Sequence, residues 1–516
     1  MSKQPVSLLQ GDIKSGLLRF ALPLFLGQVF QQLYNMVDAL VVGNFVGENA
    51  LAAVTSTGSL IFLLVGFVGG IYGGVGVVIA RSFGAGDEHQ VKRAVGTAVA
   101  GSLIAGALLT FVGVCFTPAL LRLMDTPPEV LGDAVDYLRI YFWGILFVVL
   151  YNSAVGIFQA VGDSKRPLYY LILSSVTNVV LDLLLVGVLK MGVSGAALAT
   201  VAAQALSAAL AFFRLSRVDG AYRVTLRGIC MDKSILKEML RIGVPSGVQN
   251  SVIAFANVIV QSSVNVFGAA AMAGNGAFVK LEGFAFIPIN AFAAATTTFV
   301  SQNIGARQFD RVKQGARFSL LFSCGCAAVI GVVFFLFAQP LISLFGKSPD
   351  AVASGVLRAH ICTPFYLLLA CSHGVASVCR GAGYSKVPMY IMLSTWCVLR
   401  VSYITAVTHW FHNISLVYAA YPMTWAMSTA LFLWYYKKSH WLERAQAKYG
   451  GLPHGAARTG KDGSHDPRLK VFLHEKTPAK ARFFPAFAGD LSFIFPRSVP
   501  IPSDRDGRHK TSAGGR

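Results

Sequence analysis

The sequence predicts an all-helical polytopic membrane protein with twelve transmembrane helices in two six-helix lobes. Three observations lead to this prediction. Of the 516 residues, 54% are hydrophobic and 13% are charged, and the mean hydropathy is +0.59, which is far more apolar than an ordinary soluble chain. The apolar residues gather in runs of about 20, the length at which a helix crosses a bilayer. The second half of the chain also repeats motifs of the first.

The predicted spans follow one another with short polar or Pro- and Gly-containing connections. In order along the chain they cover residues 17–43, 51–80, 94–117, 135–160, 167–189, 193–213, 241–265, 276–300, 317–339, 358–379, 387–408 and 414–436.

Lys and Arg residues occur mainly in alternate loops, whereas the opposite loops carry few of them. The segments 79–93, 214–241 and 300–314 are basic, while 124–133 carries three acids and no Lys or Arg. The positive-inside rule then predicts that both termini are cytoplasmic. The net charge of +20 is therefore partly a topology signal, and we expect no nucleic-acid partner.

An internal repeat relates the two halves at an offset of about 221 residues. The matching stretches are LRFALP (18–23) with LRIGVP (240–245), IARSFGAGDEHQVKR (79–93) with VSQNIGARQFDRVKQ (300–314), MDTPPEV (124–130) with GKSPDAV (346–352), and QAVGDSKRP (159–167) with RGAGYSKVP (380–388). Because six spans is an even number, both halves enter the membrane from the same side and are related by an axis along its normal.

The repeat predicts the domain organisation. We expect an N-lobe at 1–213, a cytoplasmic linker at 214–240, a C-lobe at 241–438 and a disordered cytoplasmic tail at 439–516. Duplicated membrane folds of this kind are typical of transporters that bind a substrate between two lobes and rock one lobe against the other. A channel or an enzyme has no need of the duplication.

A pair of carboxylates inside the predicted spans occurs in the N-lobe alone. Asp38 lies in helix 1 at the end of a polar stripe of Gln28, Gln31, Gln32 and Asn35, and Asn178 and Asp182 lie four residues apart in helix 5. The equivalent positions of the second half carry apolar side chains or Tyr403. Membrane-embedded carboxylates are costly and usually functional, and Thr200 in helix 6 is a candidate oxygen partner.

Two readings of this acid pair stay open. Two carboxylates close together in a low dielectric raise each other's affinity for a proton. Alternatively, two carboxylates, an amide oxygen and a hydroxyl form a hard-oxygen site for Na⁺. The coupling ion is therefore H⁺ or Na⁺, and no other cofactor is expected. The scattered histidines and cysteines predict no zinc site.

Other polar residues are candidates for the substrate cavity. In the C-lobe, Glu282, Lys280 and Arg400 either neutralise one another, as Glu282–Arg400 or Glu282–Lys280, or line the cavity. The remaining candidates are Gln31, Tyr34, Asn35, Asn152, Asn257 and Gln261. The alternative role is packing for Tyr34 and helix-to-helix hydrogen bonding for Asn152. The segment GGIYGGVG (69–76) predicts close helix packing rather than a phosphate loop.

The motifs together resemble those of the multidrug and toxin extrusion (MATE) family of bacterial cation-coupled exporters, from about Leu18 to Tyr436. The resemblance depends on PLFLGQVFQQLYNMVDALVVGNFVG, ARSFGAGD with its later counterpart SQNIGAR, LMDTPPEV, GDSKRP and NVVLD. In one branch of that family, the matching positions imply a cation site of Asp38, Asn178, Asp182 and Thr200, with Pro23 bending helix 1. Acids that other branches place on helices 7 and 10 are absent here, where Ile253 and Leu369 stand nearby.

The resemblance implies an antiporter that exports organic cations or amphiphilic drugs from the cell in exchange for H⁺ or Na⁺. We therefore expect a monomeric multi-pass protein of the bacterial inner or plasma membrane, with the lipid bilayer and a small amphiphilic or cationic substrate as its partners. One alternative is a flippase for a lipid-linked saccharide, which Arg400 and Lys280 favour and the acids oppose. An intramembrane enzyme is the other, but no paired nucleophile and base stands out.

Overall fold

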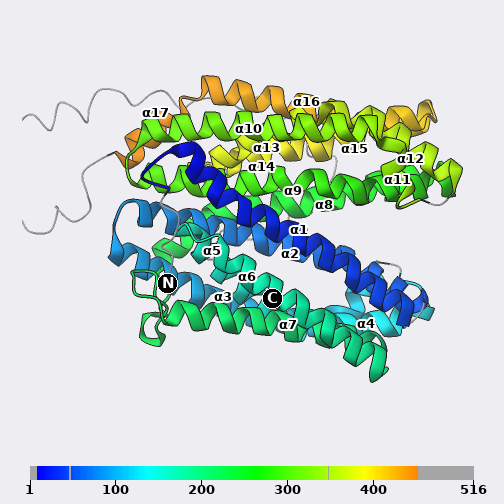
Figure 1. Ribbon diagram of the computed structural model, residues 1–516, viewed down its shortest axis with the longest axis horizontal. Coiled ribbons are helices and arrows are strands. Elements are labelled where there is room, and N and C mark those ends of the chain that lie inside the picture. The colour runs from blue at the N-terminus through cyan, green and yellow to red at the C-terminus, as the bar shows by residue number, and fades with distance from the viewer. Residues whose placement is uncertain (1–7, 46–47, 125, 347, 451–516) are drawn as a thin grey trace, which may run out of the picture. The chain divides into compact units, whose positions relative to one another are not determined.

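The computed structural model describes residues 8–45, 48–124, 126–346 and 348–450 (Figure 1). Within α1 and α2, the side chains of residues 34–45, 48–56 and 59 lie outside the description. All regular structure in the described ranges is helical, which confirms the predicted fold class. The predicted tail from residue 451 onward lies outside the described residues.

The first half of the chain forms seven α-helices and one π-helical turn. They are α1 (Ile13–Phe45), α2 (Glu48–Gly84), α3 (Glu88–Leu123), α4 (Pro128–Trp143), α5 (Ile145–Ala160), α6 (Lys165–Asp182), η1 (Leu183–Val188) and α7 (Gly192–Ser216). A short 3₁₀ turn, η2 (Leu226–Gly228), interrupts the connection to the second half.

The second half forms a corresponding set with more interruptions. Its elements are α8 (Lys233–Asn265), α9 (Ala269–Gly305), α10 (Phe309–Leu336), α11 (Ala338–Ser343), α12 (Pro349–Cys362), η3 (Thr363–Phe365), α13 (Tyr366–Gly381), α14 (Lys386–Met392), η4 (Leu393–Leu399), α15 (Arg400–Trp410), α16 (Ile414–Lys438) and α17 (Trp441–Tyr449).

Among the described residues, eleven helices are long and apolar enough to cross a membrane. A twelfth span is counted if α4 and α5, which bend by 48° at Gly144, cross together. This agrees with the twelve spans predicted from hydropathy. Several helices extend beyond the predicted spans, because hydropathy detects only the apolar part of each helix and not its polar ends.

Equivalent glycines bring the two halves together near the ends of α2 and α9. Gly84 and Gly305 are 221 residues apart, and a Cβ on either would overlap the backbone of the opposite helix at Gln302 or Arg81. At this contact Gln302 Nε2 donates to the Ala160 carbonyl at 2.6 Å. We call this end of the helix bundle the linker end, because the segment 217–232 also lies there.

A second glycine contact joins α2 to α8 along their length. Gly70 and Gly74 of α2 meet Gly247 and Gly243 of α8 so closely that a Cβ on any of them would collide with the opposite backbone. This confirms the packing role predicted for GGIYGGVG. Close backbone approach of this kind replaces the hydrophobic driving force that is absent between helices in lipid.

Helix α1 packs against both halves. Leu17, Phe20 and Leu24 share a buried cluster with α9, whereas Gly27 lies beside Leu168 and Leu171 of α6. Pro23 is buried inside the continuous helix, beside Leu24 of the first region, and its role as a bending point stays a prediction.

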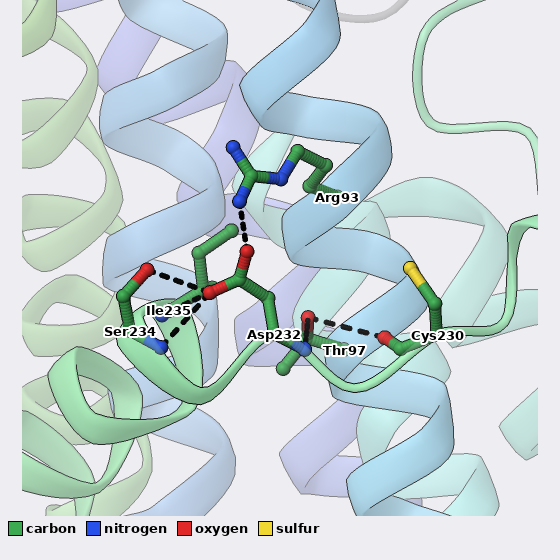
Figure 2. A network of polar contacts seen from close by, with 6 residues as sticks. All are labelled: Arg93, Thr97, Cys230, Asp232, Ser234 and Ile235. Atoms are coloured by element: carbon green, nitrogen blue, oxygen red, sulfur yellow. Dashed lines mark hydrogen bonds and ion pairs between the residues drawn. The ribbon is translucent and has the colours of Figure 1, made fainter.

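The connection between the halves is fixed to α3 (Figure 2). Asp232 caps α8 by accepting from the Ser234 and Ile235 N–H groups at 2.9 and 3.1 Å, and it also pairs with Arg93. Hydrogen bonds from Ser234 and Ile235 and the Arg93 guanidinium lower the pKa of this partly buried carboxyl below its usual range. Thr97 Oγ1 donates to the Cys230 carbonyl at 3.3 Å and accepts from the Asp232 N–H at 3.1 Å.

Residues 441–449 correct the prediction of a disordered tail from residue 439. They form α17, which packs beside α9 at the linker end. The Tyr449 hydroxyl accepts from Arg81 Nη1 at 2.7 Å, and the guanidinium lies 4.4 Å from the ring centroid. Arg81 Nη1 also pairs with Glu238 of α8 at 2.6 Å. Hydropathy missed this helix because only one of its faces is apolar.

Candidate functional site

A cavity of about 1040 Å³ lies between the two halves. Residues of α1, α2 and α5 form one wall, and residues of α8, α9, α13 and α16 form much of the other. The first wall carries the uncharged Gln28, Gln31, Gln32 and Asn152 among small glycines. The opposite wall carries charged and aromatic side chains. The cavity is large enough for a drug-sized molecule.

A second polar cluster lies inside the N-lobe, at the junction of α6, η1 and α7. Asn178 and Asp182 are 1% and 0% exposed, and Thr200 is 8% exposed. With its amide nitrogen facing the carboxylate, Asn178 donates to Asp182 Oδ2 at 2.9 Å and accepts from the Thr200 N–H at 3.1 Å. The structure therefore brings together three of the four predicted cation-site residues.

The local backbone places this cluster. Asp182 ends α6 directly before the π-helical turn η1, and π-helical turns frequently occur at functional sites. Thr200 Oγ1 donates to the Ala196 carbonyl at 3.1 Å, which fixes the direction of its lone pairs. A carboxylate, an amide oxygen and a hydroxyl are suitable ligands for a small hard cation.

Three predicted site residues belong to the second half of α1. The side chains of Tyr34, Asn35 and Asp38 lie outside the described residues, although their backbone belongs to α1. Gln31, which precedes Asp38 by about two turns, lines the cavity. Among the described residues, no group of three His, Cys, Asp or Glu side chains could hold a metal ion.

Glu282 of α9 lines the cavity and pairs with Arg358 of α12. Arg358 Nη2 lies 3.2 Å from Glu282 Oε2, and Arg358 Nη1 donates to Asn275 Oδ1. Asn275 Nδ2 in turn donates to Gln261 Oε1 at 2.5 Å. This chain of polar contacts connects α12, α9 and α8 within the C-lobe.

Arg400, the first residue of α15 after the π-helical turn η4, lies in the same wall. It is 1% exposed, and its Nε and Nη2 donate to Thr424 Oγ1 at 3.1 and 2.7 Å. The guanidinium also lies 4.9 Å from the Trp396 ring centroid and 4.6 Å from that of Tyr421. Both rings line the cavity beside it.

These contacts correct two sequence-based pairings. The ion-pair partner of Glu282 is Arg358, and neither Arg400 nor Lys280 pairs with it. Lys280 is exposed and absent from the cavity wall, because residues two apart on a helix point about 200° away from each other. Arg358 was missed because it lies at the edge of a predicted span, where a basic residue usually marks the interface.

Other predicted cavity residues lie at its wall. Asn152 of α5 lines the cavity, although its Nδ2 also donates to the Val148 carbonyl at 2.8 Å within its own helix. Asn257 and Gln261 of α8 line it as well. Arg380 and His373 of α13 also line the cavity, although neither was predicted as a lining residue.

A family model described as MatE matches residues 23–184 and, a second time, residues 245–404. The chain belongs to the MatE family. The two matched segments correspond to the two halves of the fold, and together they cover more than half of the chain. The molecule is therefore a polytopic membrane transporter.

Relatives of known name support this assignment. "Probable multidrug resistance protein YoeA" of Bacillus subtilis is 30% identical over 426 residues, which are 81% of this chain and 92% of the relative. "Probable multidrug resistance protein NorM" of Thermotoga maritima is 27% identical over 405 residues, which are 75% and 84% of the two chains.

Solved structures share the fold. An outward-facing multidrug resistance MATE family transporter superposes with a TM-score of 0.80 at 24% identity, covering 86% of this chain and 100% of that chain. A MOP superfamily transporter from Pyrococcus furiosus also has a TM-score of 0.80, at 23% identity, covering 86% and 99%.

Proposed function

We propose that this MatE transporter is a secondary antiporter that exports amphiphilic small molecules in exchange for H⁺ or Na⁺. The observation that carries the proposal is the cavity, which both halves of the repeat line. A site shared between two lobes becomes accessible from opposite sides when the lobes rock against each other. The relatives named as multidrug resistance proteins support export of drug-like amphiphiles.

The ion site in this proposal comprises Asp38, Asn178, Asp182 and Thr200, and the last three do not line the cavity. Separation of the ion site from the substrate site allows each ligand to favour a different arrangement of the lobes. In our scheme, an ion that enters from outside neutralises Asp38 and Asp182, α1 bends at Pro23, and the N-lobe part of the cavity shrinks and expels the substrate.

The linker end is cytoplasmic in this proposal, because the basic loops converge there. Contacts between the halves at this end, such as Arg81 with Glu238 and Gln302 with Ala160, are those of a state closed towards the cytoplasm. We further propose that the protein works as a monomer in the bacterial inner or plasma membrane. The flippase is not favoured, because the relatives cited above are named as multidrug resistance proteins.

Efflux from proteoliposomes tests the proposal. A proton gradient and a sodium gradient are imposed separately on the wild type, Asp38→Asn, Asp182→Asn and the control Asp133→Asn, whose carboxylate is exposed on α4. We expect one gradient to drive efflux of a fluorescent amphiphile in the wild type and control, and both ion-site variants to lose it. Gradient-driven efflux that survives in both variants would refute the ion site.

A further inference from the structure

The C-lobe wall of the cavity carries an excess of positive charge. Three arginines, Arg358, Arg380 and Arg400, line it together with a single carboxylate, Glu282. The described part of the opposite wall contributes glutamines, Asn152 and glycines but no charged side chain. This distribution disfavours a substrate whose only charge is positive.

The carboxylate of Glu282 already forms an ion pair with Arg358. The two side chains are buried, lie 3.2 Å apart, and extend through Asn275 into the hydrogen-bonded chain described above. A paired carboxylate in this position offsets the charge of one guanidinium only. Arg380 and Arg400 form no ion pair with any described residue.

Of these two arginines, Arg400 is better placed to bind an anionic group of a substrate. Thr424 and the rings of Trp396 and Tyr421 hold it on three sides, and neutral partners of this kind fix its direction without cancelling its charge. A buried guanidinium is costly unless an anion completes its surroundings. Its planar donor fork matches carboxylate, phosphate and sulfonate groups.

We propose that the substrate of this transporter is an anionic or zwitterionic amphiphile whose acidic group binds Arg400. Its apolar part lies along the aromatic side chains that continue the wall, namely Trp396, Tyr421, Phe286 and His373. Arg380, at the end of α13 nearest the linker end, provides a second positive charge along the cavity. The inference rests on the proposed export function and replaces the organic cation that the family resemblance implies.

Two probes with the same ring and opposite charge test this inference, 1-pyrenebutyrate and a pyrene-alkyl trimethylammonium ion. Binding of each to the detergent-solubilised full chain is measured by fluorescence anisotropy. We expect the wild type to bind the carboxylate at least about tenfold more tightly than the ammonium ion. Equal binding, or tighter binding of the ammonium ion, would overturn the proposal without any mutation.

Binding measurements on variants then test whether the carboxylate of pyrenebutyrate binds at Arg400. We expect Arg400→Gln to lose the preference for pyrenebutyrate, Arg400→Lys to keep part of it, and Arg317→Gln, on the exposed face of α10, to keep all of it. An unchanged dissociation constant for pyrenebutyrate in folded Arg400→Gln would refute the assignment. Displacement of pyrenebutyrate by phosphatidylglycerol micelles or by benzoate distinguishes a lipid headgroup from a soluble anion.

Transport assays with the same two probes distinguish a failure of the anion site from a failure of the antiporter proposal. If the ammonium probe alone binds and is exported under an ion gradient, the antiporter proposal stands and the anion site is wrong. If pyrenebutyrate binds through Arg400 but neither gradient drives the export of either probe, the anion site stands and the antiporter proposal is wrong.

Discussion

At the residue scale, Glu282 and Arg358 show how the C-lobe tolerates charge inside a membrane. Their side chains are 9% and 1% exposed and lie 3.2 Å apart, and Asn275 occupies a further guanidinium donor. Removal of either partner leaves the other charge buried and uncompensated, whereas removal of both leaves no such charge.

This pairing predicts a non-additive pattern of stability. Arg358→Ala should lower the free energy of unfolding by about 3 to 5 kcal/mol, because Glu282 is then buried alone. The double variant Arg358→Met with Glu282→Leu should recover most of that loss. Thermal unfolding in detergent measures the stability of the single and double variants. The control is Arg317→Ala, an exposed position, which we expect to be within about 0.5 kcal/mol of the wild type. A single variant no less stable than this control would show that the pair does not hold the C-lobe together.

Contacts within one helix were predictable from the sequence, whereas contacts between helices were not. Asn178 and Asp182 were predicted to share a face from their spacing, since positions four apart on a helix lie on the same side, and the structure places them in contact. Arg358 and Glu282 are 76 residues apart and come from different helices. No periodicity within one helix encodes such a pair, so the sequence suggested Lys280 and Arg400 as partners instead.

At the element scale, α2 and α8 are joined by glycines whose neighbours in sequence have open space. Gly74 meets the Gly243 backbone, but nothing lies within 4 Å of a Cβ built on the adjacent Gly73. This contrast makes Gly73 a matched control, since both positions gain the same helix propensity on replacement.

We therefore expect Gly74→Ala to be less stable than Gly73→Ala by about 1 to 3 kcal/mol, because the added methyl group forces the two helices apart. Thermal unfolding of the two purified variants measures the difference directly. Equal stability would mean that α2 and α8 do not approach as closely in the protein as the glycine contact requires.

The connection between the lobes predicts a dependence on pH. A carboxyl with a lowered pKa in the folded state adds stability that is fully present above its unfolded pKa of about 3.9 and is lost as pH falls through the lower folded value. The difference in melting temperature between wild type and Asp232→Asn should thus be constant from about pH 5 to 7 and shrink below about pH 4. A difference that does not change with pH would exclude this role for Asp232.

At the scale of the whole molecule, hydropathy and the internal repeat were sufficient to predict the fold. The spans were visible because lipid demands long apolar runs, and the repeat was visible because equivalent turns such as ARSFGAGD and SQNIGAR preserve similar residues. The charge of the cavity wall was not predictable in the same way. It depends on which faces of α12, α13 and α15 turn inward, and helix packing decides this.

The ion site and the cavity belong to one mechanism only if ion binding changes the arrangement of the lobes. Glu88 at the start of α3 and Asp310 at the start of α10 are exposed, at the linker end, on opposite halves. Spin labels at these positions report opening of that end towards the cytoplasm.

Double electron–electron resonance between labels at positions 88 and 310 tests this central claim most directly. In wild type, we expect the coupling ion, H⁺ or Na⁺, to increase the population with the longer distance, and Asp182→Asn to abolish that response. A distance distribution that is the same with and without either ion would contradict ion-coupled alternating access in this protein.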